Sequence, residues 1–170
     1  SEFTCDGFDG LDPRKAYVFV SNHRDIVLDT SLLNVALYDN HLSMTASAMG
    51  DNLLRKKYLK ILAMLNRNII IYRSLPPREA LEHSKLVSEY IYHCITEEHR
   101  NVWIAQREGR TKNGDDRTQQ GVLKMLTLNA PEDTSPLQYL KTLNLVPMSI
   151  SYEFDPTDLL KLPALIAQHN

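Results

Sequence analysis

The sequence contains Ile69-Ile70-Ile71-Tyr72, an unbroken apolar run of mostly β-branched residues, and Arg73 follows it directly. β-Branched residues favour strands, and a strand that is apolar on both faces suits a sheet covered on both sides. Such strands are typical of α/β proteins, in which crossover helices cover the two faces of the sheet. This stretch therefore predicts an α/β fold with a largely parallel or mixed sheet between helices.

The same alternation of short β-rich runs and longer helical patterns extends over most of the chain. The expected strands are Ala16 to Ser21, Met44 to Ala48, Ile69 to Tyr72, Val102 to Ala105 and Val146 to Ser151. The expected helices are Thr30 to Tyr38, Asn52 to Leu65, Glu79 to Thr96 and Gln119 to Leu128. The stretch from Ala130 to Pro136 is typical of a loop.

Two of these helices carry apolar stripes at helical spacing, which predicts that both pack on the core. One stripe contains Leu54, Tyr58, Ile61 and Leu65, and the other contains Leu81, Val87, Ile91, Cys94 and Ile95. A short amphipathic segment from Leu159 to Ala167, interrupted at Pro163, is also expected to pack on the core.

The composition is that of one globular domain spanning residues 1–170, because 43% of the 170 residues are hydrophobic and 24% are charged. Lysine and arginine total 19 against 21 acidic residues, so the net charge of −2 provides no general field for binding nucleic acid. The longest apolar runs fall short of the roughly 18 residues that a membrane-spanning helix needs. We expect no nucleic-acid partner and no spanning segment.

The two cysteines, Cys5 and Cys94, are too few for a disulfide scaffold. Cys94 lies on an apolar helical stripe, which predicts a buried reduced thiol. This pattern favours a reducing compartment.

Unusual polar residues follow directly after the first four expected strands. They are Asn22 and His23, then Gly50-Asp51-Asn52, then Arg73, and finally Arg107-Glu108-Gly109-Arg110. In a parallel α/β sheet, ligands bind in the crevice beyond the carboxyl ends of the strands. If the strands are parallel, these groups converge on one site.

The segment Ser21-Asn22-His23-Arg24-Asp25-Ile26-Val27-Leu28-Asp29 places a histidine and two carboxylates at a strand-to-helix junction. An imidazole can take up a proton at neutral pH, and a carboxylate at its other nitrogen fixes the tautomer. Residues six positions apart lie on different faces of a helix, so His23 is expected in the loop, with Asp29 reaching back from the first helical turn. Asp25 is an alternative orienting group.

Other interpretations of this segment remain open. Asp29 is also a suitable helix cap, and His23 is a candidate for a purely structural role. A metal site formed by His23, Asp25 and Asp29 would support a metal-dependent hydrolase, but the spacing matches no established zinc or helical pattern, and we expect no metal.

Two cationic features lie further along the chain. Arg73 can bind two phosphate oxygens through its guanidinium, although an arginine paired to an acid at the sheet edge is an equal alternative. In the loop from Arg107 to Gly114, Gly109 permits close approach of an anion, and Arg107, Arg110 and Lys112 supply positive charge. A plain solvated turn would also explain this loop.

Four groups of residues resemble, in order and spacing, the four motifs of the glycerolipid acyltransferases, which include the glycerol-3-phosphate and 1-acylglycerol-3-phosphate acyltransferases. These groups are Asn22-His23 with Asp29, Arg73, Glu108-Gly109-Arg110 and Val146-Pro147-Met148-Ser149-Ile150. The resemblance extends from Tyr17 to about Asp158, and the sequences of the motifs are similar to those of a bacterial subgroup of the family. Five residues separate His23 from Asp29, where the family usually has four, and Arg110 follows Gly109 directly.

The resemblance implies transfer of a fatty acyl group from acyl-CoA or acyl-carrier protein to a hydroxyl of lysophosphatidate, in phospholipid biosynthesis and without a cofactor. By the family pattern, His23 is the general base and Asp29 orients it. Arg73 binds the acceptor phosphate, and Glu108, Gly109 and Arg110 shape the acceptor site. Pro147 belongs to the last motif.

The alternatives are an acceptor such as glycerol 3-phosphate or an amino-acid lipid head group, and a non-catalytic phospholipid-binding domain. The implied partners are the acyl donor, a lysophospholipid and a membrane surface. The implied location is the cytoplasmic face of the inner membrane, with attachment that is peripheral or provided by segments outside this chain.

Overall fold

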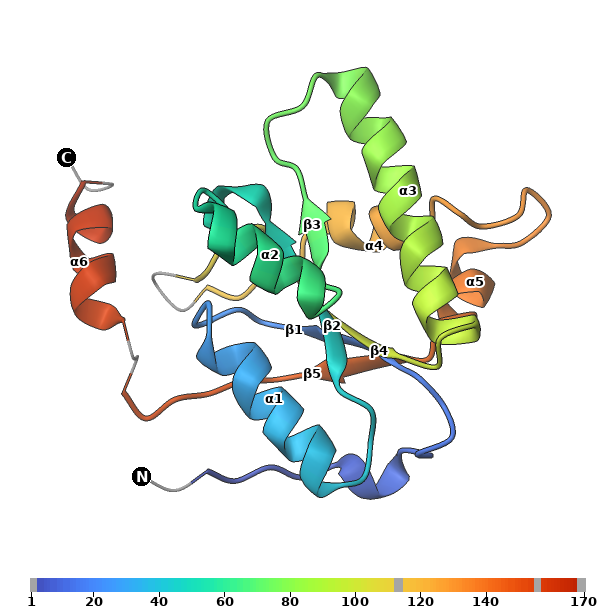
Figure 1. The fold of residues 1–170 in the computed structure, drawn as a ribbon, viewed down its shortest axis with the longest axis horizontal. Coiled ribbons are helices and arrows are strands. Elements are labelled where there is room, and N and C mark those ends of the chain that lie inside the picture. The colour runs from blue at the N-terminus through green and yellow to red at the C-terminus, as the bar shows by residue number, and fades with distance from the viewer. Residues whose placement is uncertain (1–2, 112–114, 155–156, 168–170) are drawn as a thin grey trace.

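A five-stranded sheet forms the centre of the computed structural model, which describes residues 3–111, 115–154 and 157–167 (Figure 1). The strands are β1 (Val18–Ser21), β2 (Thr45–Gly50), β3 (Ile69–Ile71), β4 (Asn101–Ala105) and β5 (Leu145–Met148). Their order is β3-β2-β4-β1-β5, and all four neighbouring pairs are parallel. The predicted α/β class is confirmed.

The carboxyl ends of the strands lie at one edge of this sheet. Ser21, the last residue of β1, pairs with Ala105 of β4 on one side and with Met148 of β5 on the other. Gly50, the last residue of β2, pairs with Ile71 of β3. The loops that follow these strands therefore leave from the same edge, as the parallel arrangement predicts.

Helices cover both faces of the sheet. The longer helical elements are α1 (Leu28–Asp39), α2 (Lys57–Leu65), α3 (Pro77–Thr96), α4 (Gln120–Leu126), α5 (Pro136–Thr142) and α6 (Asp158–Ile166). Two short 3-10 helices, η1 (Phe8–Gly10) and η2 (Asp51–Leu53), complete the set among the described residues. The helix α5 begins at Pro136, the last residue of the expected loop, and a capping box between Ser135 and Gln138 fixes its start.

Two apolar clusters hold the layers together. On one face of the sheet, α1 contributes Leu33 and Leu37, which pack with Phe19 of β1 and Trp103 of β4. On the other face, α3, α4 and α5 cover Val18 and Val102, and the buried residues that they contribute include Ile91, Cys94, Leu126 and Tyr139. Successive residues of a strand thus enter different clusters, as the period of two requires.

The prediction that the apolar stripe of α2 packs on the core is wrong. The exposed fractions of Tyr58, Ile61 and Leu65 are 57%, 48% and 76%, and Ala63 is the buried residue of this helix. The helix leads into β3, the edge strand, and the described residues beyond that edge supply no layer to cover its outer side. The expected helix from Asn52 is also divided into η2 and α2.

The stripe of α3 is buried as predicted, except at Leu81, which lies in the first turns of the helix and is 50% exposed. The C-terminal segment differs more. Leu159, Leu162 and Ile166 of α6 are all more than half exposed, and Figure 1 shows this helix to one side, away from the sheet. The expected packing on the core is therefore not found for the described side chains of this segment, and Lys161 ties α6 to the loop after β1 by donating to the carbonyl of Arg24.

In the described part of the chain, no helix combines the length and apolar character that crossing a bilayer requires.

Candidate active site

A cleft of about 630 Å³ opens at the carboxyl edge of the sheet. The candidate site residues that line it are His23, Arg73, Glu108 and Gly109. Side chains from the start of α1 and from β2 extend the lining, among them Ser31, Asn34 and Ser47. The loops after β1, β3 and β4 thus contribute to one cavity, as their positions in the sequence predict.

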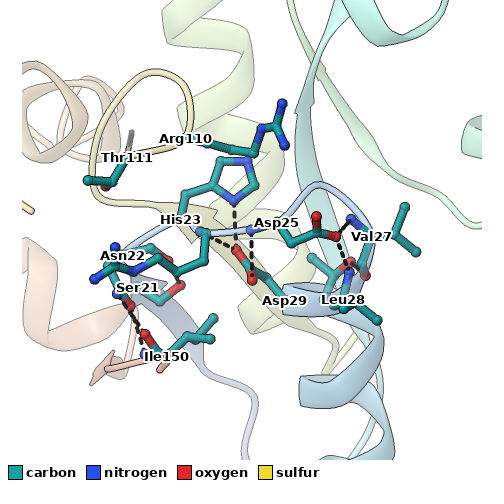
Figure 2. A network of polar contacts seen from close by, with 12 residues as sticks. Ser21, Asn22, His23, Asp25, Val27, Leu28, Asp29, Arg110, Thr111 and Ile150 are labelled. Carbon is teal, nitrogen blue, oxygen red and sulfur yellow. Dashed lines mark hydrogen bonds and ion pairs between the residues drawn. The ribbon is translucent and has the colours of Figure 1, made fainter. Parts of the chain in front are cut away.

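His23 and Asp29 are in direct contact. Nδ1 of His23 lies 2.8 Å from Oδ2 of Asp29 (Figure 2). The helix α1 begins at Leu28, so Asp29 lies in its first turn and reaches back to the loop that carries His23. This is the arrangement that the six-residue separation predicts.

The surroundings of Asp29 fix the tautomer of His23. The Asp29 side chain has no exposed surface, and it accepts hydrogen bonds from the backbone N–H groups of Arg24 and Asp25. Because these groups can only donate, the carboxylate acts as an acceptor, and Nδ1 of His23 carries the proton. Nε2 then keeps its lone pair for a proton from a ligand in the cleft.

Asp25 has a different role from Asp29. Its Oδ1 accepts the backbone N–H groups of Val27 and Leu28, both at 2.9 Å, just ahead of α1. Burial by itself raises the pKa of Asp25, but these two hydrogen bonds and the charges of Arg110 and Lys161 more than offset it, so the pKa lies below its usual value. Asp25 thus stabilises the turn that accommodates five residues between His23 and Asp29.

Trp103 holds the imidazole from the side. The centroids of the two rings lie 5.5 Å apart at an angle of 70°, which is an edge-to-face contact. The indole Nε1–H of Trp103 donates to Oγ of Ser21 at 2.9 Å. The His23 ring is therefore constrained by Asp29 at one nitrogen and by Trp103 on its face.

The loop after β1 is tied to two other loops. Asn22 donates to the carbonyl of Ile150 and accepts its N–H, at 2.8 and 2.7 Å, in the manner of a strand pair. The carboxylate of Asp116 accepts hydrogen bonds from the amide of Asn22 and the hydroxyl of Thr111, and it forms an ion pair with Arg24. These contacts fix the position of His23 relative to the segments after β4 and β5.

Arg73 lies at the cationic end of the cleft. Its Nη1 is 3.5 Å from Oε1 of Glu108, and the exposed fractions of the two side chains are 36% and 65%. An ion pair this exposed contributes little stability, so a phosphate can replace the carboxylate. The guanidinium also lies over Gly50, where an added Cβ would come within 2.6 Å of Nε.

The other arginines of the predicted site are placed differently. Arg107 lines the cleft, and its Nε–H is buried without a partner among the described residues. Arg110 is outside the cleft lining and donates to Oγ1 of Thr157 at 3.0 Å. Gly109 has a φ of +72°, a backbone conformation that glycine adopts more readily than other residues. Lys112 lies outside the described residues.

The buried thiol does not line this cleft. Cys94 is fully buried on the face of the sheet covered by α3, as predicted, and burial raises its pKa. An unreactive thiol of this kind is typical of a core residue. Within residues 3–111, 115–154 and 157–167, no group of three or more His, Cys, Asp or Glu side chains is arranged to hold a metal ion.

Sequence reasoning missed two groups that the structure places beside the pair. Trp103 was interpreted only as part of a strand, although the single tryptophan next to the Arg107 loop was a usable signal. Tyr152 donates its hydroxyl to Oδ1 of Asp29 at 2.8 Å from 123 positions along the chain, and no local pattern indicates this contact.

Comparison with known proteins identifies a family for this chain. A family model described as Acyltransferase matches residues 2–151, most of the chain. Searches of curated proteins and of solved structures returned no match.

Proposed function

This chain belongs to the acyltransferase family, and from that premise we propose that it transfers a fatty acyl group from acyl-CoA or acyl-carrier protein to a hydroxyl of lysophosphatidate, in phospholipid biosynthesis. The observation that carries the proposal is the contact between His23 and Asp29 at a cleft that also holds Arg73 and Arg107. A base and a group of cations in one cavity suit an acceptor that has both a hydroxyl and a phosphate.

The chemistry begins at Nε2 of His23. This nitrogen takes the proton of the acceptor hydroxyl while the hydroxyl oxygen attacks the carbonyl carbon of the thioester. A new C–O bond forms, the C–S bond breaks, and the proton passes from the imidazolium to the leaving sulfur as a thiol. General base catalysis of this kind contributes a factor of about 10² to 10⁴ in rate.

Asp29 stabilises the imidazolium that forms during the step, since its buried carboxylate faces Nδ1. The acyl group passes directly to the acceptor in this proposal. Cys94 is fully buried in the core and is not among the residues that line the cleft, so it supplies no nucleophile there.

The acceptor phosphate is assigned to Arg73 and Arg107. Both line the cleft, and the Nε–H of Arg107, which has no partner in the described part of the chain, is a buried donor that an anion would satisfy. Glu108 and Gly109 border the same space. Arg110 is held by Thr157, so we assign it a supporting role at the edge of the site in place of direct phosphate contact.

We also propose that the protein works at a membrane surface, at the cytoplasmic face of the inner membrane, where a lysophospholipid resides. The helix α2 exposes Tyr58, Ile61, Leu62, Met64 and Leu65. Lys56, Lys57 and Lys60, at its start, are also exposed. Apolar and cationic side chains on one exposed helix suit an anionic bilayer. Vesicle sedimentation with and without anionic lipid tests this, and binding unaffected by Ile61→Glu would contradict it.

The decisive experiment offers the purified protein a panel of acyl-CoA and acyl-carrier-protein thioesters with lysophosphatidate, glycerol 3-phosphate and amino-acid lipid acceptors. Thiol release is followed, and mass spectrometry identifies the product. We expect acylated lysophosphatidate, and we expect His23→Ala to lose about 10²- to 10⁴-fold in rate while keeping its circular dichroism spectrum.

Other outcomes identify the alternatives. Lipid binding that persists in the wild type and in His23→Ala, with no thioester consumed by either, would indicate a binding domain. Activity that a chelator abolishes, again without thioester consumption, would indicate a metal-dependent hydrolase. A product from glycerol 3-phosphate alone would change the acceptor and leave the class of reaction intact.

A further inference from the structure

Tyr152 contacts the candidate orienting carboxylate from the far end of the chain. Its hydroxyl donates to Oδ1 of Asp29 at 2.8 Å, across a separation of 123 residues. We propose that Tyr152 is a positioning residue, which holds the Asp29 carboxylate in the orientation that His23 requires. This inference rests on the proposed function, because it concerns the same proton transfer. The family model ends at residue 151, so Tyr152 lies just beyond the matched residues.

The hydrogen bonds of Asp29 show why this hydroxyl matters. Oδ2 accepts both Nδ1 of His23 and the N–H of Arg24 at 2.8 Å. Oδ1 accepts the N–H of Asp25 at 3.1 Å and the hydroxyl of Tyr152 at 2.8 Å. Tyr152 therefore makes the shorter of the two contacts that fix Oδ1.

The Asp29 side chain is fully buried, so solvent cannot replace a missing donor at no cost. Without the hydroxyl of Tyr152, Oδ1 keeps only the longer contact to the backbone of Asp25. The carboxylate can then rotate about its Cβ–Cγ bond, and rotation moves Oδ2 out of line with Nδ1 of His23. A misaligned carboxylate no longer fixes the tautomer or stabilises the imidazolium.

The segment that carries Tyr152 is itself held against the loop that carries His23. Two residues before Tyr152, Ile150 exchanges two hydrogen bonds with the side chain of Asn22. Beyond it, Thr157 accepts from Arg110, and Lys161 donates to the carbonyl of Arg24. Contacts on both sides of Tyr152 thus keep its hydroxyl at Asp29.

A positioning role predicts which kinetic constant changes. Neither Asp29 nor Tyr152 is among the residues that line the cleft, so neither is placed to contact substrate. Removal of the Tyr152 hydroxyl should therefore lower kcat and leave the KM of both substrates unchanged.

The test compares Tyr152→Phe with Tyr17→Phe. The hydroxyl of Tyr17 is a matched control, because it is also partly buried and accepts the N–H of Asp12 at 2.7 Å, near the opposite end of β1. Both variants are assayed at a temperature at which circular dichroism shows them fully folded. We expect Tyr152→Phe to lose about 10-fold in kcat, with both KM values within about twofold of wild type, and Tyr17→Phe to match wild type.

A second readout does not depend on turnover. The Nδ1 proton of His23 is observed by NMR in protein with ¹⁵N-labelled histidine. We expect its resonance to broaden in Tyr152→Phe, because a carboxylate that is no longer fixed protects this proton less from exchange with water. The resonance should stay unchanged in Tyr17→Phe.

The outcomes separate this inference from the proposed function. A wild-type protein that transfers no acyl group to any acceptor overturns the proposed function, while the NMR comparison still decides the role of Tyr152. An unchanged Nδ1 resonance in Tyr152→Phe, or a kcat within twofold of an active wild type, overturns the positioning role. A rise in KM with constant kcat would also overturn it, because it would place Tyr152 in substrate binding.

Discussion

Gly50→Ala is expected to weaken acceptor binding without affecting the catalytic pair. Gly50 ends β2, and an added Cβ would lie closest to Oδ1 of Asn52, and 2.6 Å from Nε and 3.0 Å from Cζ of Arg73. Ordinary van der Waals contact begins near 3.4 Å, so the guanidinium has to move by about 0.8 Å. Asn52 and Arg73 both meet the added Cβ with the ends of flexible side chains, and we expect both to shift, which displaces Arg73 from its place in the cleft.

The magnitude follows from the contact that is lost. A charge-assisted hydrogen bond contributes about 1.5 to 3 kcal/mol, and partial loss of one corresponds to about 1.4 kcal/mol, or tenfold in binding. The KM for the phosphate acceptor should therefore rise about tenfold, with kcat and the KM for the donor unchanged. Gly50 has φ −70°, which alanine adopts readily, so the free energy of unfolding should change by less than about 1 kcal/mol.

The assay is steady-state thiol release with the acceptor varied, combined with thermal unfolding. Gly10→Ala is the control, since an added Cβ at Gly10 meets nothing within 4 Å. The double variant Gly50→Ala/Arg73→Ala decides the mechanism: if Gly50 acts through Arg73, the Gly50 substitution has no further effect once Arg73 is removed. Fully additive effects on the acceptor KM would refute the reasoning.

Three further predictions concern the surroundings of His23. Asp29→Asn should lower kcat by about 10²- to 10⁴-fold. Asparagine carries an N–H₂ group in place of one carboxylate oxygen, and this group would face hydrogen-bond donors and favour the wrong tautomer of His23. An unchanged kcat in the steady-state assay would contradict this prediction. Asp25→Ala should cost about 1 kcal/mol of stability at neutral pH, measured by urea unfolding, because two N–H groups lose their acceptor. The folded-state pKa of Asp25 is lowered, so the charge-dependent part of this difference should be complete above about pH 4 and be lost as the pH falls through the folded pKa; a difference that grows in acid would show that the sign is wrong. Trp103→Phe should reduce kcat severalfold and cost about 1 to 3 kcal/mol, since it removes the indole donor to Ser21 and leaves a void beside the imidazole; kinetics and thermal unfolding measure the two effects, and wild-type values in both would exclude a role for the indole.

Local patterns were sufficient to predict the sheet and the edge at which the site forms. The apolar run at Ile69 correctly indicated a strand, although the structure places it at the edge of the sheet with Ile70 and Ile71 only half-buried. Parallel pairing then required His23, Arg73 and Glu108 to leave from the same edge. Helical geometry predicted that His23 lies in the loop, because residues six positions apart cannot share one helix face, and that a partner at Asp29 would have to reach back from the first turn. These features depend on periodicity and connection order, both of which a single sequence contains.

The sequence did not determine which carboxylate orients the histidine. That choice depends on whether α1 begins at Thr30, as the pattern suggested, or at Leu28, as the structure has it. The earlier start places Asp25 ahead of the helix, where it accepts backbone N–H groups, and leaves Asp29 for His23. Helix boundaries are set by such side-chain contacts more than by apolar periodicity.

Periodicity also did not determine what covers an apolar face. The stripe of α2 is as regular as that of α3, yet α3 is buried in the core and α2 is exposed at the edge of the sheet. The contact of Tyr152 with Asp29 was equally inaccessible, because it joins residues 123 positions apart with no regular pairing between them.

The paired hydrogen bonds between Asn22 and Ile150 have a consequence for synthesis of the protein on the ribosome. They join residues 128 positions apart, so the loop that carries His23 leaves the exit tunnel long before its partner does. Within the described sheet, β1 pairs only with β4 and β5, and the contacts of Ile150 and Tyr152 are added after all five strands have been translated. The arrangement of His23, Asp29 and Tyr152 is thus completed only when the last part of the chain is available.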